Sequence, residues 1–171
     1  MKGTYTILVT CESSMRVKFG RLGYAEVGKG FYLYTGSALG RGAVSLEGRL
    51  KRHSRVSKRV RWHVDYLTCH PSAKVKAAVC LRSPRRLECL ISRAVSGKMN
   101  ASPLIPHIGA SDCKCRGHLV RADSSLNAAM IVSRLKRIYL KFGQPFLLSV
   151  YPETKSPDLL PTSSRTRLER S

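Results

Sequence analysis

The chain has 171 residues, 43% of them hydrophobic, which suits one domain with a buried core and excludes wholesale disorder. Lysine and arginine number 31 against 10 acidic residues, and the formal charge of +21 indicates a polyanionic partner, above all nucleic acid. No apolar stretch approaches the ~20 residues of a membrane span and neither terminus resembles a targeting signal, so we expect a cytoplasmic protein without a membrane partner.

The first part of the chain predicts two strands on either side of a glycine-rich segment. Residues 3–11 alternate and are rich in Thr, Tyr, Ile and Val, which is typical of a strand. Four glycines punctuate residues 15–30, where short strands or an irregular hairpin are expected. Residues 31–36 then predict a second strand that ends at a glycine.

A helix, a short apolar segment and a third strand follow. Ser45 can cap a helix in which Leu46, Arg49, Leu50 and His53 recur at helical spacing, so one face mixes leucines with a cation and an imidazole. The aromatic stretch "VRWHVDYLTCH" predicts a short helix or turn packed on the core. Residues 73–81 alternate between apolar and other side chains and predict a strand.

The second half predicts two helices joined by a loop. Ser83 as N-cap, Pro84 at the first helical position and Gly97 as a stop signal define the first of these helices. Residues 101–119 predict a loop, and residues 125–142 predict a basic amphipathic helix. From residue 144 to 171 the pattern gives way to proline, serine and arginine, which predicts a mostly flexible basic tail. The element order indicates a mixed α/β (α+β) domain.

The glycine-rich turn after the second strand does not match the known phosphate-binding loops. A Walker loop requires Gly-Lys-Ser or Gly-Lys-Thr at the start of the following helix, and this sequence is absent. The stretch "GSALGRG" also lacks the glycine spacing and the acidic residue of a dinucleotide-binding fold. The turn therefore indicates a different chemistry.

The order of motifs resembles that of the GIY-YIG nuclease superfamily. Gly3-Thr4-Tyr5 and Tyr34-Thr35-Gly36 stand at the two signature triplets, "EGRLKRH" at the helix that carries an arginine, and Glu88 at the metal-binding glutamate. The combination of "GFYLYTGSALG", "LEGRLKRH", "RWHVDYL" and "SDCKCRGHL" looks like a related branch, common in archaea and long catalogued as a domain of unknown function. Two threonines replace aliphatic residues in the triplets, and the asparagine found late in many superfamily members has no counterpart.

The resemblance implies a fold and a domain organisation. It covers residues 1–120 and implies a small, mainly antiparallel three-stranded sheet flanked by helices. Residues 121–143 are then a basic C-terminal helix packed on this domain, and residues 144–171 are the tail.

The resemblance also implies a metal-dependent endonuclease that hydrolyses phosphodiester bonds in DNA, with branched or damaged DNA as candidate substrates. Tyr5 or Tyr34 would exchange protons with the attacking water, Arg49 would hold the phosphate, and Glu88 would bind a divalent ion, magnesium or manganese. His53 would contact the same phosphate or transfer a proton, or else cap the helix. From the residues alone, the tyrosines are more often half-buried sheet aromatics, and Glu88 would ordinarily be an ion-pair partner of Arg85 or Arg93.

A non-catalytic nucleic-acid-binding module with the same fold is the alternative. Both hypotheses predict contacts between basic side chains and phosphates, because charge alone does not distinguish them. We expect these contacts from the region of the first helix and from the last helix, at Arg41, Arg49, Arg52, Arg134, Lys136, Arg137 and Lys141.

Cys113, Cys115 and His118 offer two thiols and an imidazole within six residues. A zinc site would need a fourth ligand from His53, His63, His107 or Asp112, and the Cys-x-Cys spacing is tighter than in common zinc motifs. We favour a packing role over zinc, in which the loop folds against the first helix and Asp112 and His118 orient Arg49 or His53 through hydrogen bonds. His63 is expected to pair with Asp65 or to pack beneath the site.

Overall fold

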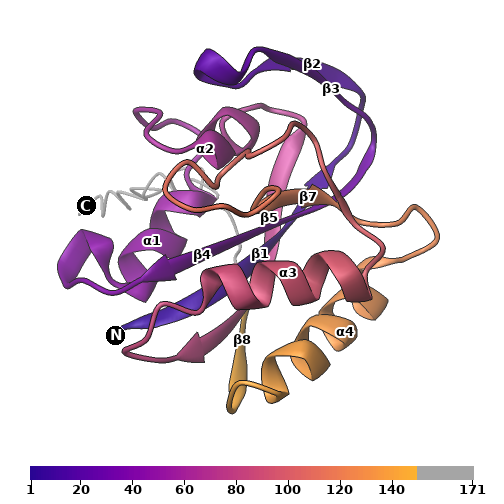
Figure 1. The fold of residues 1–171 in the computed structure, drawn as a ribbon. Coiled ribbons are helices and arrows are strands. Elements are labelled where there is room, and N and C mark those ends of the chain that lie inside the picture. Colours follow the sequence, from indigo (N-terminus) through magenta and orange to yellow (C-terminus); the bar gives the residue numbers. More distant parts are fainter. Residues whose placement is uncertain (150–171) are drawn as a thin grey trace, which may run out of the picture.

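The computed structural model describes residues 1–149, and six strands form its central sheet in the order β6-β7-β4-β1-β5-β8 (Figure 1). Every pair of neighbours is antiparallel. The three long strands agree with the predicted ones. The strands are β1 (Gly3–Cys11), β4 (Gly30–Ala38), β5 (Ala73–Arg82), β6 (Ser102–Pro103), β7 (Leu119–Arg121) and β8 (Pro145–Ser149).

The prediction of a three-stranded sheet is wrong, because three short strands extend the sheet at its two edges. β7 pairs with β4 on one side and β8 pairs with β5 on the other. Segments of two to five residues are too short to show the alternation by which a strand is predicted. The tail predicted from residue 144 likewise differs at 145–149, which form β8, and its remainder lies outside the described residues.

The glycine-rich segment between β1 and β4 forms a hairpin of two short strands, in agreement with the short strands or hairpin expected there. Strands β2 (Met15–Lys18) and β3 (Tyr24–Val27) pair antiparallel as a second, separate sheet. A 3-10 turn, Gly20–Leu22, connects them. The hairpin lies at the end of the central sheet near helix α2 (His63–Thr68) (Figure 1).

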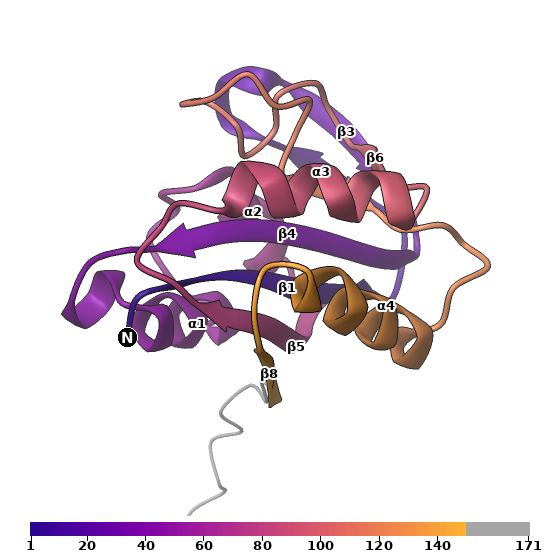
Figure 2. The same cartoon turned by 60° about the horizontal axis from the view of Figure 1, so that its bottom comes forward.

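The remaining helices cover both faces of the central sheet. Helices α1 (Leu46–Ser54) and α2 contribute Leu50 and Val64 to a core that contains Ile7 of β1. Helices α3 (Glu88–Lys98) and α4 (Ala128–Leu140) contribute Ile91 and Leu135 to a second core that contains Leu8. Successive residues of a strand face opposite sides, so these are the two faces of one sheet. α3 lies along β4, and α4 lies beside β1 and β5 (Figure 2).

The structure confirms the predicted start of α1 and corrects that of α3. Ser45 caps α1, because its Oγ accepts a hydrogen bond from the Gly48 amide at 3.2 Å. In the segment before α3, the Ser83 hydroxyl instead accepts from the Arg85 amide at 3.0 Å and holds a turn, so the helix begins at Glu88. Gly97 lies inside α3, where open space surrounds it, and does not stop the helix.

Candidate functional site

A cleft of about 880 Å³ lies between the first two helices and the loop of residues 104–118. Side chains from several separate parts of the chain line it, so only the tertiary fold brings them together. They include Tyr34 of β4, Arg49 of α1, Trp62 and His63 at the start of α2, Glu88 at the start of α3, and Asp112 and His118 of the loop.

The two signature tyrosines pack against each other but occupy different positions. Tyr34 lies in the wall of the cleft, whereas Tyr5 is fully buried behind it, with the two ring centroids 6.4 Å apart. Gly36 makes this packing possible, because a Cβ there would lie 2.8 Å from the Tyr5 hydroxyl oxygen and 3.2 Å from Cε1 of Tyr34. Gly3 instead allows the close approach of β1 to β5, since a Cβ there would lie 2.3 Å from the carbonyl oxygen of Leu81.

Both phenols are neutral at neutral pH. Burial raises the pKa of Tyr34 to about 12, although the Arg49 guanidinium acts in the opposite direction. Burial also raises the pKa of Tyr5 well above its usual value. Neither hydroxyl is therefore a base in the free protein, and Tyr34 is available in the cleft as a neutral hydrogen-bonding group.

His53 lies behind the cleft wall, 1% exposed, and not beside Arg49 in the cleft. Its Nε2 shares a 2.8 Å hydrogen bond with the Tyr5 hydroxyl, and its ring lies against those of Tyr34 and Trp62 at centroid distances of 5.7 and 5.8 Å. Burial, followed by the Lys58 cation, lowers the pKa of His53 to about 3. This neutral imidazole supports the tyrosine pair from within.

The buried neutral His53 should make the protein less stable in mild acid. The unfolded chain binds a proton at about pH 6.5 and the folded chain only near pH 3, so protonation favours unfolding between these values. Below pH 6.5 the free energy of unfolding should fall by up to about 1.4 kcal/mol per pH unit on account of this residue. His53→Gln, which can keep the Tyr5 hydrogen bond, should lose that part of the slope in urea unfolding between pH 5 and 6.5. Equal slopes in both proteins would contradict a buried neutral imidazole.

Arg49 and Arg52 lie on consecutive turns of α1 but have different surroundings. The Cζ atoms of both lie 4.8 Å from the centre of the Trp62 ring, so the indole supports both cations. Arg52 is held by the Asp65 carboxylate and the Arg59 carbonyl, each at 2.6 Å, and does not line the cleft. Arg49 lines the cleft and makes no ion pair within residues 1–149, which leaves its guanidinium available to a phosphate.

Asp65 holds the segment between α1 and α2 in place. Its carboxylate is fully buried and accepts hydrogen bonds from the amides of Arg61 and Trp62 at 2.9 and 3.0 Å, besides that from Arg52. Burial raises the pKa of Asp65, but these hydrogen bonds and the Lys58 cation outweigh it, and the net pKa is below the usual value. Asp65 therefore fixes the backbone at Trp62, whose ring lies against Arg49.

His63 does not pair with Asp65, contrary to one of its two expected roles. Its Nδ1 accepts a hydrogen bond from the Gly109 amide at 3.1 Å and so joins the start of α2 to the loop. Both residues line the cleft.

Glu88 presents one carboxylate oxygen without a hydrogen-bond partner. Its side chain is 6% exposed, and Oε1 accepts a hydrogen bond from Nε of Arg86 at 2.5 Å. Oε2 is buried and has no partner within residues 1–149. Arg86 also pairs with the Asp112 carboxylate, so one guanidinium bridges the only two acidic side chains that line the cleft in the described part of the chain. No motif in the sequence distinguishes Arg86, although it lies two residues before Glu88.

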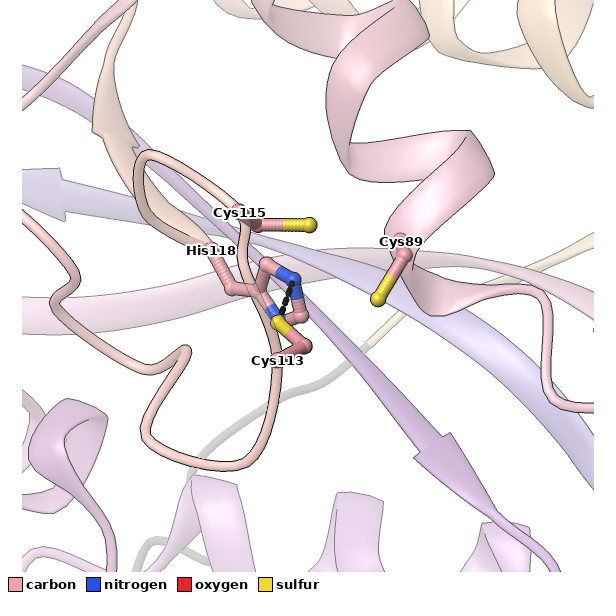
Figure 3. A group of neighbouring side chains, drawn as sticks. All are labelled: Cys89, Cys113, Cys115 and His118. Atoms are coloured by element: carbon pink, nitrogen blue, oxygen red, sulfur yellow. Dashed lines mark hydrogen bonds between the residues drawn. The ribbon is translucent and has the colours of Figure 1, made fainter.

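Cys89, Cys113, Cys115 and His118 form a cluster that could hold a metal ion (Figure 3). The fourth member, Cys89, is none of the four residues proposed from the sequence, all of which make other contacts. His53 forms a hydrogen bond with Tyr5, and His63 forms one with Gly109. Asp112 is hydrogen-bonded to Arg86, and Nδ1 of His107 is hydrogen-bonded to the Cys115 carbonyl at 2.9 Å.

The favoured packing hypothesis for this loop is wrong in its contacts. Within residues 1–149 neither Asp112 nor His118 hydrogen-bonds to Arg49 or His53. Asp112 pairs with Arg86, and Nε2 of His118 lies 3.6 Å from Sγ of Cys113.

The structure separates the two groups of basic residues that we expected to contact nucleic acid. Arg41 is exposed next to α1 but does not line the cleft. Lys136 is exposed on α4, on the opposite side of the sheet from α1. A second hollow of about 640 Å³ beside α3 and α4 is lined by Lys98, Arg134, Arg137 and Lys141. Two further cations at the cleft, Arg21 and Arg61, carry no motif that would have distinguished them in the sequence.

None of the helices within residues 1–149 is long and apolar enough to cross a membrane. No curated protein and no solved structure shows significant similarity to the chain. A family model described as a domain of unknown function, DUF123, matches residues 4–140 and so extends from β1 through α4. This match includes α4, which lies beyond the residues 1–120 of the resemblance. The chain therefore belongs to the DUF123 family.

Proposed function

We propose that this protein is a metal-dependent endonuclease that hydrolyses phosphodiester bonds in DNA, with branched or damaged DNA as candidate substrates. One observation carries the proposal: Tyr34, Arg49 and Glu88 line the same cleft, and the buried carboxylate of Glu88 has one oxygen, Oε2, without a partner within residues 1–149. A cation, a hydroxyl and a free carboxylate oxygen are groups that phosphodiester hydrolysis requires.

A GIY-YIG type of fold is part of the proposal. The two signature triplets lie on β1 and β4, which are adjacent strands, and Tyr5 is paired directly with Gly36 in the register. The arginine follows on α1 and the glutamate opens α3. This order and these adjacencies support the resemblance on which the nuclease hypothesis rests.

The residues present fit a divalent metal ion of the magnesium type. Oε2 of Glu88 is an oxygen ligand, which hard cations prefer, and as a buried atom without a partner it gains one when a cation binds. Magnesium commonly takes only one or two protein carboxylates, together with water and phosphate oxygens, so Glu88 is a sufficient protein ligand. A bound magnesium ion would neutralise charge on the phosphate and acidify a water molecule.

Each remaining residue has a part that its position explains. Arg49 offers a planar guanidinium to two phosphate oxygens, and this guanidinium lies against the Trp62 ring. Tyr34, neutral because its pKa is about 12, hydrogen-bonds to the water or to the phosphate. Hydrolysis adds the water oxygen to phosphorus, breaks the bond to one bridging oxygen and delivers a water proton to that leaving oxygen.

The alternative is a nucleic-acid-binding module without catalysis, and one observation favours it. Arg86 lies between Glu88 and Asp112 and already neutralises the carboxylate that would bind the metal. The formal charge of +21 supports both hypotheses equally.

Incubation of the purified chain with single-stranded, duplex, flap and four-way DNA, with magnesium, manganese or EDTA, tests the proposal. We expect cleavage of at least one substrate that requires the divalent ion and stops in EDTA. Binding to the panel without cleavage under any of these conditions would favour the alternative. Cleavage that persists in EDTA would exclude the metal-dependent mechanism.

A further inference from the structure

We propose that Cys89, Cys113, Cys115 and His118 bind one structural zinc ion that fastens the loop of residues 104–118 to the first turn of α3. The site is separate from the carboxylate of Glu88 and holds whether or not the protein cleaves DNA.

The four side chains are already grouped at nearly the spacing of a zinc site. Their ligand atoms all lie within 4.8 Å of one another, and Nε2 of His118 is 3.6 Å from Sγ of Cys113. Zn–S bonds of about 2.3 Å place the sulfurs of a tetrahedral site about 3.8 Å apart, so an ion requires a contraction of about 1 Å at most. Figure 3 shows Cys89 on the helix facing the three residues of the loop.

Backbone contacts hold the loop in this shape independently of the cysteines. The His107 amide donates to the Arg116 carbonyl and the His118 amide to the Ile108 carbonyl, both at 2.7 Å. Gly117 fits only as glycine, since a Cβ there would lie 2.7 Å from Cβ of Pro103. The chain therefore presents Cys115 and His118 in a fixed turn on the side that faces α3.

A second contact fixes α3 relative to the loop. The Ser92 hydroxyl, about one turn after Cys89, donates a hydrogen bond to the Gly117 carbonyl at 3.1 Å and is buried. The packing of α3 against the loop therefore brings Cys89 close to the other three ligands. The position of its thiol is set by this packing and by the Ser92 hydrogen bond.

The ligand types favour zinc over other ions. Three thiolates and one imidazole are soft and intermediate ligands, which bind zinc and not magnesium. A cluster of several irons would hold the cysteine sulfurs farther apart than a single ion does, and these four atoms lie close together. Four protein ligands leave no position for water or substrate, which is the arrangement of a structural zinc site.

The charge balance is compatible with this strongly basic chain. Zinc binding releases the three thiol protons to solvent and gives a complex with a net charge of −1. Lys114 and Arg116, which alternate with the ligands in "CKCRGH", are exposed cations beside it. The chain can therefore accommodate one additional negative charge here.

Zinc bound here would stabilise one wall of the cleft. The loop contributes Gly109, Ser111 and Asp112 to the cleft lining, and α3 contributes Glu88, the residue before Cys89. Removal of the ion should therefore loosen the loop while the central sheet stays folded. Hydrogen exchange of the amides of residues 107–118 should accelerate by at least about tenfold, since opening of this segment no longer breaks metal–ligand bonds.

Metal analysis of the full chain, purified without a histidine tag and kept reduced, tests the site directly. We expect about one zinc per chain after gel filtration, released when the thiols are titrated with a mercurial reagent. Replacement by cobalt should give thiolate-to-cobalt charge-transfer absorption and the intense visible bands of a tetrahedral ion. Cobalt bound only at Glu88 would show neither, so the readout separates this site from that of the proposed nuclease.

Cys89→Ser is the informative variant, because it changes the ligand that comes from outside the loop. It should lower the zinc affinity by at least about tenfold. Cys69→Ser is the matched control, since Cys69 is also partly exposed but lies outside the cluster and should keep its zinc.

Reduced wild-type protein that holds no zinc after exposure to excess metal would overturn the proposal, as would cobalt spectra without thiolate bands. Equal zinc affinities of Cys89→Ser and Cys69→Ser would exclude Cys89 as a ligand and overturn the proposal as well. If Cys89→Ser does not fold, the wild-type zinc content and cobalt spectrum still decide the question.

Discussion

Glu88→Gln is expected to lower the rate of magnesium-dependent DNA cleavage by about a thousandfold while DNA affinity stays nearly unchanged. A metal ion contributes several kcal/mol to stabilising the transition state, and about 4 kcal/mol corresponds to this factor. The amide keeps the size of the side chain but is a much weaker ligand than the carboxylate. Affinity for DNA depends mainly on the many cations around the cleft, which the substitution leaves in place. Single-turnover cleavage and binding measured without metal separate the two effects.

Asp112→Asn is the matched control for this change. Asp112 also lines the cleft and also pairs with Arg86, but it is exposed, whereas Glu88 is buried. Its loss should change the cleavage rate by less than about tenfold, because an exposed ion pair contributes little. Equal losses in both variants would mean that the carboxylates act only by positioning Arg86. Undiminished cleavage by Glu88→Gln would remove Glu88 from the metal site.

The long elements of the fold could be predicted from the sequence because each is long enough to show its own composition and its own end signals. β1, β4 and β5 have nine or ten residues, β1 and β4 are rich in β-branched and aromatic side chains, and Ser45 marks the start of α1. The edge strands could not be predicted, since β6, β7 and β8 are defined by pairing with strands already in place. The start of α3 was misplaced because Ser83 bonds locally to Arg85 and forms a turn there.

The candidate site divides in the same way between residues that a motif indicated and residues that only the fold reveals. Tyr34, Arg49 and Glu88 were expected in one site, and all three line the cleft. The helical pattern alone could not show which other side chains of α1 line the cleft and which are buried behind it. Periodicity places His53 and Arg49 on one face of α1, but the depth of each in the core depends on what covers that face.

Cys89 shows the limit of motif reading at the metal cluster. The sequence has six cysteines, and nothing in the spacing between Cys89 and the "DCKCRGHL" segment marks it as their partner. Its position in the first turn of α3, facing the loop, follows from the packing of that helix along β4. A search for ligand pairs at fixed spacing therefore does not identify this residue.

Asp65→Asn is expected to lower the free energy of unfolding by about 3–5 kcal/mol at neutral pH, the cost of removing one partner from a buried ion pair. The carboxylate is fully buried and accepts two amide hydrogen bonds as well as that of Arg52. The Lys58 ammonium, which lies 3.7 Å from Oδ1 and is 3% exposed, would lose its counter-ion. Urea unfolding followed by circular dichroism and by Trp62 fluorescence measures the loss, because Trp62 is the only tryptophan.

Acidification distinguishes a lost charge from lost packing in Asp65→Asn. The pKa of Asp65 is lowered in the folded protein, so its stabilising effect is complete above about pH 3.9, the ordinary value for aspartate, and declines as the pH falls through the folded pKa. The difference in stability between wild type and variant should therefore shrink below about pH 3.9. Glu12→Gln, which breaks an exposed ion pair with Lys74, should leave the free energy of unfolding nearly unchanged both at neutral pH and below about pH 3.9. A difference for Asp65→Asn that does not depend on pH would show that the asparagine disturbs packing and that the carboxylate charge is not what stabilises the Arg52, Trp62 and Lys58 arrangement.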